Sequence, residues 1–186
     1  EIAPSAPLKK DDQLSVTYRG FTKTVLDIYE IDHITADTEK NTYLIGEDFD
    51  KGSMTVTAFY KKDSGEHEER VTDFSIDPKK SDEAGNCTVT IEYQGKACTL
   101  MLTIVDPNEI TSISITGPKK AQYFDDEELD TTGLVVTGKI NSGTEVSVPL
   151  DLVKIEEGTS ESGKVTVTVT YKEKTATFEI HRTLEI

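Results

Sequence analysis

The sequence predicts an all-β fold built of tandem two-layer β-sandwiches, with two full units and an N-terminal partial unit. A five-residue segment ending in Tyr recurs at residues 14–18, 89–93 and 167–171, so its tyrosines lie 75 and 78 residues apart. Each copy passes through a short polar turn into a second stretch of alternating apolar and polar residues. No helical period of useful length is present. A repeat of this length is typical of a tandem array, and the alternation is typical of half-buried strands.

The repeat divides the chain into three segments. Residues 1–30 are predicted to be a leader followed by the terminal hairpin of a partial repeat, residues 31–106 the first repeat, and residues 107–186 the second repeat. The two full repeats align with an offset of 80, which falls to 78 because the first repeat carries two extra residues in a hairpin loop near residues 61–65. We expect the offset of 78 to hold from there on, so that Asp73 and Phe74 match Asp151 and Leu152.

The last hairpin gives the clearest strand pattern. We expect the apolar residues that alternate with polar ones to face inward, because a shift of one residue would place threonines in the core. These inward positions are Val165, Val167, Val169, Tyr171, Ala176, Phe178 and Ile180. The turn between the strands, Lys172-Glu173, has no glycine, unlike Arg19-Gly20 and Gln94-Gly95. Because Glu tolerates positive φ poorly, we expect a longer or bulged turn in this copy.

Composition bounds the partners. The chain has 186 residues, 35 acidic and 20 basic, with a net charge of −15. An acidic surface repels nucleic acid and anionic lipid, so we predict neither as a partner. No run of 18 apolar residues is present, which argues against membrane insertion. The sequence begins with Glu1 rather than Met, and we interpret it as a mature or trimmed piece.

Motifs of the second repeat resemble a known family. The segments Pro118-Lys-Lys-Ala-Gln-Tyr123, Tyr123-Phe-Asp-Asp-Glu-Glu-Leu-Asp130, Gly133-Leu-Val-Val-Thr137 and Val167-Thr-Val-Thr-Tyr171 resemble the bacterial immunoglobulin-like domain, group 3. The first repeat resembles it more loosely, and residues 11–30 match only its terminal hairpin. The resemblance implies immunoglobulin-like sandwiches without catalytic residues, found in tandem in secreted or cell-wall-anchored bacterial proteins as spacers, stalks or adhesion modules.

The two cysteines are predicted to be free. With Gln94-Gly95 as a two-residue turn, Cys87 pairs with Leu102 and Cys98 with Ile91, which separates the thiols by roughly 13 Å along the hairpin. A disulfide needs Cα atoms within about 7 Å. We therefore expect buried thiols that act as small apolar side chains.

Neither a catalytic nor a metal site is predicted. The three histidines are isolated, and no nucleophile elbow, HExxH motif or Gly-rich phosphate loop is present. Oxygen ligands for Ca²⁺ occur in three loops, around Asp48, Asp126 and Asp106, but none completes a calcium-binding pattern. We interpret these carboxylates as solvated loop residues and predict no cofactor. A calcium ion between the repeats is the alternative.

Aromatic residues outside the repeat are the candidate contact residues. Tyrosines that recur at one hairpin position, Tyr18, Tyr93 and Tyr171, are expected to pack in the core. In contrast, Tyr29, Phe59 and Tyr60 have no counterpart in the other repeat. We expect Phe59 and Tyr60 to be partly buried at a hairpin rim. The alternative is that they form, with Tyr29, a contact patch for a surface protein or a glycan.

The hairpin of residues 11–30 is expected to pack against another part of a protein, because an isolated two-stranded hairpin is only marginally stable. We expect it to dock on the first repeat of the same chain and the protein to be a monomer; strand exchange into a dimer is the alternative.

These observations predict a non-enzymatic, extracellular bacterial immunoglobulin-like repeat protein, secreted or cell-wall associated. It would act as a spacer or stalk, with a role in cell adhesion or surface interaction. The alternative is a carbohydrate-binding accessory module of a larger secreted enzyme. Clustered exposed aromatics would favour the second interpretation.

Overall fold

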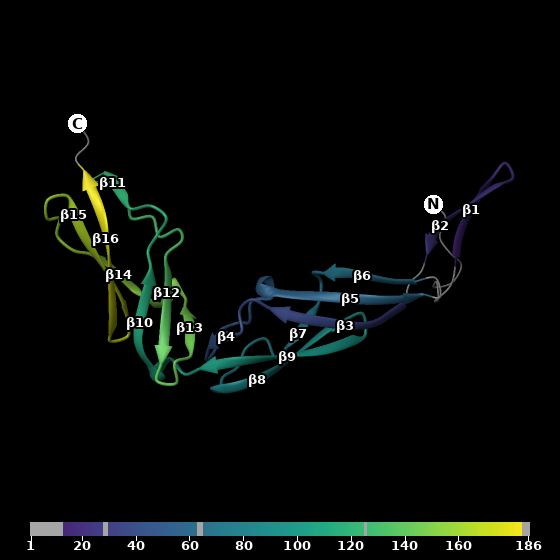
Figure 1. The fold of residues 1–186 in the computed structure, drawn as a ribbon, viewed down its shortest axis with the longest axis horizontal. Coiled ribbons are helices and arrows are strands. Elements are labelled where there is room, and N and C mark those ends of the chain that lie inside the picture. Colours follow the sequence, from purple (N-terminus) through teal and green to yellow (C-terminus); the bar gives the residue numbers. More distant parts are fainter. Residues whose placement is uncertain (1–12, 28–29, 63–64, 125, 184–186) are drawn as a thin grey trace. The chain divides into compact units, whose positions relative to one another are not determined.

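Strands account for nearly all regular structure in the computed structural model, which describes residues 13–27, 30–62, 65–124 and 126–183. The sheets of residues 30–105 form the first repeat, and those of residues 110–183 form the second repeat (Figure 1). This confirms the predicted fold class, an all-β chain of tandem sandwiches.

The first repeat has two sheets. One, ordered β3-β5-β6, contains β3 (Glu30–Thr38), β5 (Met54–Lys62) and β6 (Gly65–Val71). The other, ordered β4-β9-β8-β7, contains β4 (Thr42–Leu44), β7 (Ser75–Asp77), β8 (Gly85–Tyr93) and β9 (Lys96–Val105). Strand β5 is antiparallel to both β3 and β6, and β7 is antiparallel to β8, whereas β4 runs parallel to the last strand, β9. A short 3-10 helix, η1 (Lys51–Ser53), precedes β5.

The second repeat repeats this arrangement. Its sheets are ordered β10-β12-β13 and β11-β16-β15-β14. Their strands are β10 (Ile110–Thr116), β11 (Gln122–Phe124), β12 (Val135–Ile140), β13 (Glu145–Val148), β14 (Lys154–Glu157), β15 (Lys164–Tyr171) and β16 (Lys174–Thr183). Again only β11 and the last strand, β16, are parallel. Two 3-10 helices, η2 (Pro107–Glu109) and η3 (Leu150–Leu152), lie before β10 and after β13.

The inward faces follow the predicted alternation. In β15 the residues Val165, Val167, Val169 and Tyr171 are all at most 4% exposed. In β16 the alternate residues Ala176, Phe178 and Ile180 are half-buried or buried, between exposed neighbours. These strands pack on the other sheet through a cluster that includes Val136, Val146, Val148, Val169 and Tyr171. Each large apolar side chain buried in this way contributes roughly 1.5–3 kcal/mol.

The turn predicted to be longer has two residues. Tyr171 pairs with Lys174, so Lys172 and Glu173 alone form the turn, and Lys172 takes the positive φ of 51°. Gln94 and Arg19 occupy the same place in the other copies with φ of 45° and 48°. The prediction was wrong because the first turn position carries positive φ on a non-glycine residue in every copy, so the strands keep their register without an extra residue.

The predicted offset of 78 is wrong in two strands. Glu92 and Thr170 are equivalent, yet Glu92 pairs with Ser75 and Thr170 with Lys154, so β7 and β14 differ by 79. In β6 and β13 the offset is 77, since Val71 and Val148 occupy the same register. The η3 helix adds two residues between these strands in the second repeat. Phe74, 6% exposed, therefore corresponds to Val153, and Leu152 is 53% exposed.

The N-terminal hairpin forms as predicted. Strand β1 (Gln13–Tyr18) pairs with β2 (Phe21–Asp27) in a sheet of two strands, with a register shift after Leu14. Tyr18 is 70% exposed at its turn, so it lacks the packing role expected from recurrence, and the described residues supply two strands to its sheet. Docking of the hairpin on the first repeat stays a prediction.

Gly138 leaves room on β12 for the side chain of Ile110 from the neighbouring strand β10. A Cβ at Gly138 would lie 2.8 Å from Cδ1 of Ile110, which is buried. The first repeat has Ala58 at the position 80 residues earlier, and that side chain is fully buried.

Contacts divide the chain into two compact units that do not coincide with the repeats. One holds the chain up to residue 40 together with 49–79 and 88–101, and the other holds 41–48, 80–87 and the chain from 102 on. The predicted domain boundaries, 1–30, 31–106 and 107–186, stay predictions.

Candidate functional site

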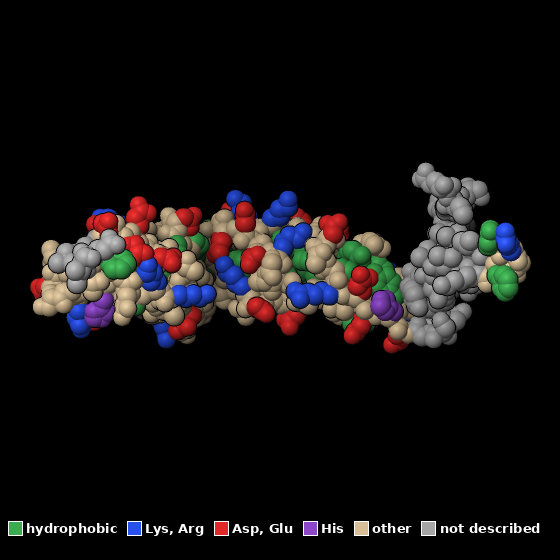
Figure 2. Space-filling view, turned by 90° about the horizontal axis from the view of Figure 1, so that it is seen from above, with side chains coloured by type: hydrophobic (Ala, Val, Ile, Leu, Met, Phe, Trp, Pro, Cys, Tyr) green, Lys and Arg blue, Asp and Glu red, His purple; other side chains and the backbone are tan. Residues whose placement is uncertain are grey.

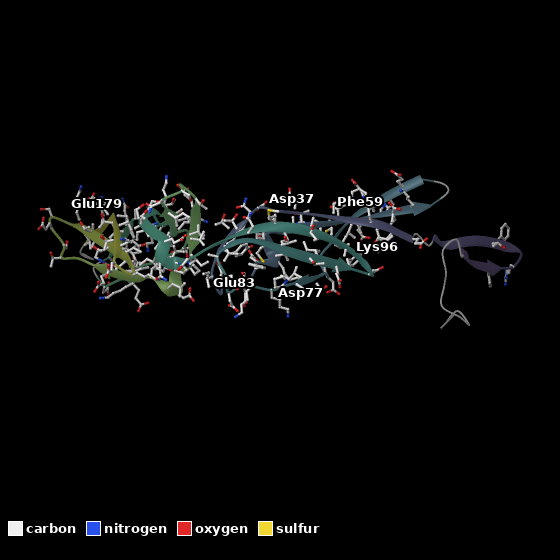
Figure 3. All side chains as sticks on the ribbon, turned by 90° about the horizontal axis from the view of Figure 1, so that it is seen from below. Asp37, Phe59, Asp77, Glu83, Lys96 and Glu179 are labelled. Atoms are coloured by element: carbon white, nitrogen blue, oxygen red, sulfur yellow. The ribbon has the colours of Figure 1, made fainter. Side chains whose placement is uncertain are left out.

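The predicted contact residues do not form one patch. Phe59 and Tyr60 are neighbours on β5, and successive strand residues point to opposite faces. Phe59 lies on the outer face of the first repeat, on the same side as Asp37 (Figure 3). Tyr60 continues the inward series of Val56 and Ala58. Tyr29 lies outside the described residues.

On the outer face, Phe59 stacks on a histidine. The rings of His33 and Phe59 are stacked in nearly parallel planes, with centroids 4.5 Å apart. Nδ1 of His33 lies 2.8 Å from the carboxylate of Asp32, which also binds Nζ of Lys61 at 2.9 Å. The hydrogen bonds from His33 and Lys61 lower the pKa of Asp32, and the bond to Asp32 raises the pKa of Lys61. His33 is about half exposed, so the stack presents part of its aromatic surface to solvent.

On the inner face, Tyr60 belongs to a group of polar rings at one end of the sandwich. Its ring lies 5.8 Å from that of His67, and its hydroxyl bonds to Tyr93. Burial first, and then the bond to Tyr93, raise the pKa of Tyr60 to about 12. Tyr93 in turn accepts a hydrogen bond of 3.0 Å from Nε2 of Gln94.

A groove of about 510 Å³ begins at this group. It is lined by Asp73, Phe74, Ser75, Glu92, Tyr93, Gln94 and Gly95, and so runs beside the edge strand β7. The lining combines an accessible tyrosine with carboxylate, amide and hydroxyl groups, which can bind a ligand rich in hydroxyls.

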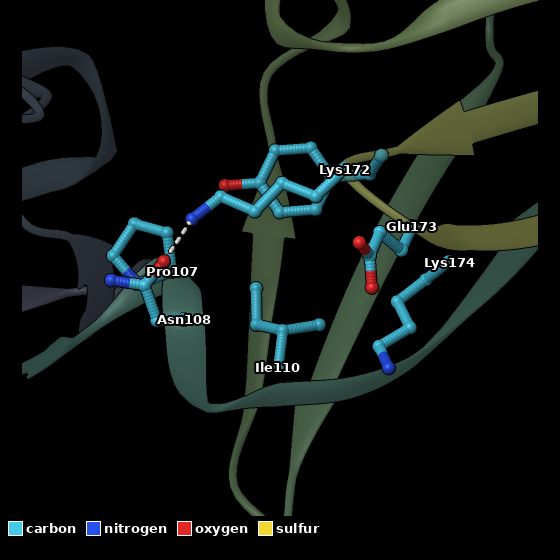
Figure 4. A pocket seen from close by; sticks show the side chains of 7 residues that line it. Pro107, Asn108, Ile110, Lys172, Glu173 and Lys174 are labelled. Atoms are coloured by element: carbon cyan, nitrogen blue, oxygen red, sulfur yellow. Dashed lines mark hydrogen bonds between the residues drawn. The ribbon is translucent and has the colours of Figure 1, made fainter.

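The second repeat has a different pocket at its corresponding turn. It measures about 320 Å³ and is lined by Pro107, Asn108, Ile110, Tyr171, Lys172, Glu173 and Lys174. Nζ of Lys172 donates to Oδ1 of Asn108 at 2.6 Å (Figure 4). Burial, and then the charge of Asp106, raise the pKa of Tyr171. Lys172, Glu173 and Lys174 all line this pocket, and Lys172 is already bonded to Asn108. The pocket therefore favours neither an anionic nor a cationic ligand.

Loop carboxylates make equivalent hydrogen bonds in the two repeats. Asp50 accepts from the N–H of Gly52 at 2.8 Å, and Asp130, 80 residues later, accepts from Thr132 at 2.9 Å. Likewise Glu47 accepts from Leu44 at 2.8 Å, and Glu127 accepts from Phe124 at 3.3 Å. Asp106 makes a similar bond to Asn108.

These bonds close turns, which explains why acidic residues recur there. Among the described residues, no group of three or more His, Cys, Asp or Glu side chains is placed to hold a metal ion. Acidic and basic side chains are interspersed on the face that Figure 2 shows, without a large area of one sign.

The cysteines are free and half-buried. Both lie at inward positions, Cys87 on β8 and Cys98 on β9, and burial raises the pKa of the Cys98 thiol. The predicted absence of a disulfide is confirmed for the structure, but the thiols are less buried than expected.

The sequence argument missed Arg182. It continues the inward series of Phe178 and Ile180, and its side chain is only 11% exposed. Nε and Nη2 each lie 2.8 Å from a carboxylate oxygen of Glu157, and Nη1 donates to the carbonyls of Phe124 and Glu127. The first repeat has buried Ile104 at this register position. A charged residue on an apolar alternation is the signal that could have found it.

Comparison with known families supports the sandwich topology. The bacterial Ig-like domain (group 3) matches residues 36–104 and again residues 116–182. The chain belongs to this family. The two matches cover both repeats, and the resemblance identified from the sequence motifs is confirmed. Membership of the bacterial Ig-like domain family indicates a repeat protein of the cell surface or the extracellular space and a non-catalytic module.

One curated relative of this Ig-like chain carries an enzyme name. An exo-beta-1,6-galactobiohydrolase of Bifidobacterium longum is 32% identical over 117 residues. The match covers 60% of this chain but 8% of that protein.

Solved structures that resemble the Ig-like chain come from a surface layer protein. Domains 1–6 of SbsC align with 13% identity and a TM-score of 0.37, covering 89% of this chain and 28% of that one. Domains 4–9 align with 15% identity and a TM-score of 0.32, covering 92% and 34%. Within the part of the Ig-like chain that the structure describes, no helix is long and apolar enough to cross a membrane.

Proposed function

We propose that the chain is a non-enzymatic spacer of a secreted or cell-wall-associated bacterial protein, with a role in adhesion or other surface interaction. The observation that carries the proposal is the parallel pairing of an early strand with the last strand in each repeat. Thr42 pairs with Thr103 in the first repeat, and Gln122 pairs with His181 in the second.

This parallel pairing helps a repeat to resist a force that pulls on its two ends. When a repeat is pulled from its two ends, β11 and β16 are drawn in opposite directions along their shared axis. Their hydrogen bonds lie across that axis and are loaded together, as are those of β4 and β9. Bonds loaded together resist more force than bonds that open one after another. A spacer between a cell surface and a binding partner needs this resistance.

Single-molecule stretching tests the spacer role. Pulled from its ends, the chain should unfold in two discrete steps, each releasing roughly 250 Å of extended chain. The control applies force to the second repeat through Lys164 and the C-terminal end, which lie at the same end of the β15–β16 hairpin, so that β15 and β16 separate one bond at a time. The forces should then be clearly lower. Gradual extension without steps, or equal forces in the two geometries, would count against the proposal.

The surface partner of such a spacer is proposed to be a protein or a glycan. The His33–Phe59 stack is the contact area that the geometry favours on the outer face, because Asp32 and the ring of Phe59 hold the imidazole in place. We further propose a monomer. A solution mass near 20.5 kDa would agree with it, whereas twice that value would favour strand exchange through residues 1–30.

A carbohydrate-binding accessory module of a larger secreted enzyme is the second candidate. The relative named as an exo-beta-1,6-galactobiohydrolase favours it, since the shared segment is a small fraction of that protein. A glycan array with the purified chain tests this candidate, and Tyr60→Ala is the first variant to compare. If no glycan is retained, the second candidate fails and the spacer role is unaffected.

A further inference from the structure

Comparison of the two repeats separates residues that maintain the fold from residues with another role. Turn-closing carboxylates and buried strand positions occur in both copies, as described above. The groove beside β7 does not. By register, Ser75 corresponds to Lys154, and Glu92 corresponds to Thr170. Gln94 corresponds to Lys172 at the turn. The polar lining of the groove is therefore not needed to build this fold.

The shared tyrosine also differs in its surroundings. Tyr171 is 4% exposed, whereas Tyr93 is half-buried and lines the groove. The hydroxyl of Tyr93 accepts a hydrogen bond of 3.0 Å from Nε2 of Gln94 and is also bonded to the hydroxyl of Tyr60. A phenol hydroxyl has one proton and two lone pairs, so it can make three hydrogen bonds.

Two of these three bonds are made within the protein, so one position on the Tyr93 hydroxyl remains for a ligand. The hydroxyl lines the groove and is held in place by Gln94, so it is suited to bind a ligand hydroxyl.

We propose that this groove binds a neutral saccharide. Tyr93 would hydrogen-bond to a sugar hydroxyl, the carboxylates of Asp73 and Glu92 would accept from sugar hydroxyls, and Ser75 and Gln94 could donate or accept. No basic residue lines the groove, and two carboxylates do. An anionic sugar would be repelled, especially by a chain with a net charge of −15. This inference rests on the carbohydrate-binding candidate and gives it a site.

The test is an NMR titration of the ¹⁵N-labelled chain with three neutral disaccharides, β-1,6-galactobiose, cellobiose and maltose. Digalacturonic acid serves as the anionic probe of the same size. We expect at least one neutral sugar to shift the resonances of Ser75 and of the Gln94 side-chain amide, and the acid to shift neither. Tyr93→Phe keeps the ring and removes the hydroxyl, so binding should weaken about fivefold. Tyr171→Phe is the matched control and should bind as the parent does.

Each other outcome rejects the site. Absence of shifts with every neutral sugar at about 10 mM would overturn both the site and the carbohydrate-binding candidate. Binding that Tyr93→Phe leaves unchanged, or shifts confined to other residues, would overturn this site alone and leave that candidate intact. Preference for digalacturonic acid would contradict the charge argument. Unchanged amide spectra of both variants without sugar would establish that they fold.

Discussion

Arg182 binds Glu157 through two parallel hydrogen bonds of 2.8 Å, and this pair joins the last strand of the second repeat to β14. A third nitrogen of the same guanidinium holds two carbonyls of the β11 loop. The pair is therefore part of a network in which every member has a partner, at a place where the first repeat has an isoleucine.

Removal of this arginine should destabilise the second repeat. Arg182→Ala leaves the Glu157 carboxylate and two carbonyls without their donor, and we expect a loss of about 2–4 kcal/mol in the free energy of unfolding, measured by urea denaturation. The matched control is the exposed pair Lys164–Glu179, in which Lys164→Ala should cost no more than about 0.5 kcal/mol. Similar losses in the two variants would show that the network contributes little.

Acid should weaken the second repeat through its loop carboxylates. Hydrogen bonds from Thr132 lower the pKa of Asp130, and Lys120, followed by the N–H of Phe124, lowers the pKa of Glu127. Because the folded-state pKa lies below the unfolded one, their stabilisation is complete above the ordinary carboxyl pKa. It is lost as pH falls through the lowered value. Melting temperatures measured from neutral pH downward should fall less steeply for Asp130→Asn, and an unchanged slope would refute the prediction.

Alkali should act through Tyr60. Its pKa of about 12 exceeds the ordinary value of 10.0, so the unfolded chain loses this proton first. The contribution of the Tyr60 proton to the free energy of unfolding is fully present below pH 10 and is lost as pH rises from about 10 to 12. An ultraviolet titration of phenolate absorbance should show one tyrosine with a midpoint near 12, absent from Tyr60→Phe. Tyr93→Phe should move this midpoint downward, and a titration with no late component would disprove the assignment.

The cysteines should be replaceable by the residues of the other repeat. Cys87→Val and Cys98→Ala introduce the equivalents Val165 and Ala176, and each should change the free energy of unfolding by less than about 1 kcal/mol. Thermal melts of both variants check this. The intact mass of the parent chain should be that of two thiols, and a mass lower by two hydrogens would contradict the free state.

The duplication made much of the fold predictable. Two copies of a strand pattern identify the inward residues of β15 and β16 independently of any structure, and these positions were confirmed. The offset between the copies changes from 77 at β6 and β13 to 79 at β7 and β14, because η3 adds two residues. A fixed offset of 78 therefore matched Phe74 to the wrong residue of the second repeat. Backbone conformation at Lys172 likewise could not be read from residue type, because strand pairing on both sides of the turn imposes it.

The candidate site was less predictable. The groove residues Asp73 and Glu92 lie 19 positions apart and meet only because β7 pairs with β8. Phe59 and Tyr60 were grouped because they are adjacent in sequence, although strand geometry alone places them on opposite faces. Residue type identified aromatic side chains correctly, but the face and the neighbouring strand decide what each can contact.

The missing methyl group at Gly138 limits how the chain can misassemble. Neighbouring domains of similar sequence misfold when one incorporates a strand of the other. If β5 took the place of β12, the methyl group of Ala58 would meet Ile110, which fills that space in the native second repeat. This contact therefore opposes the entry of β5 into the second repeat during folding.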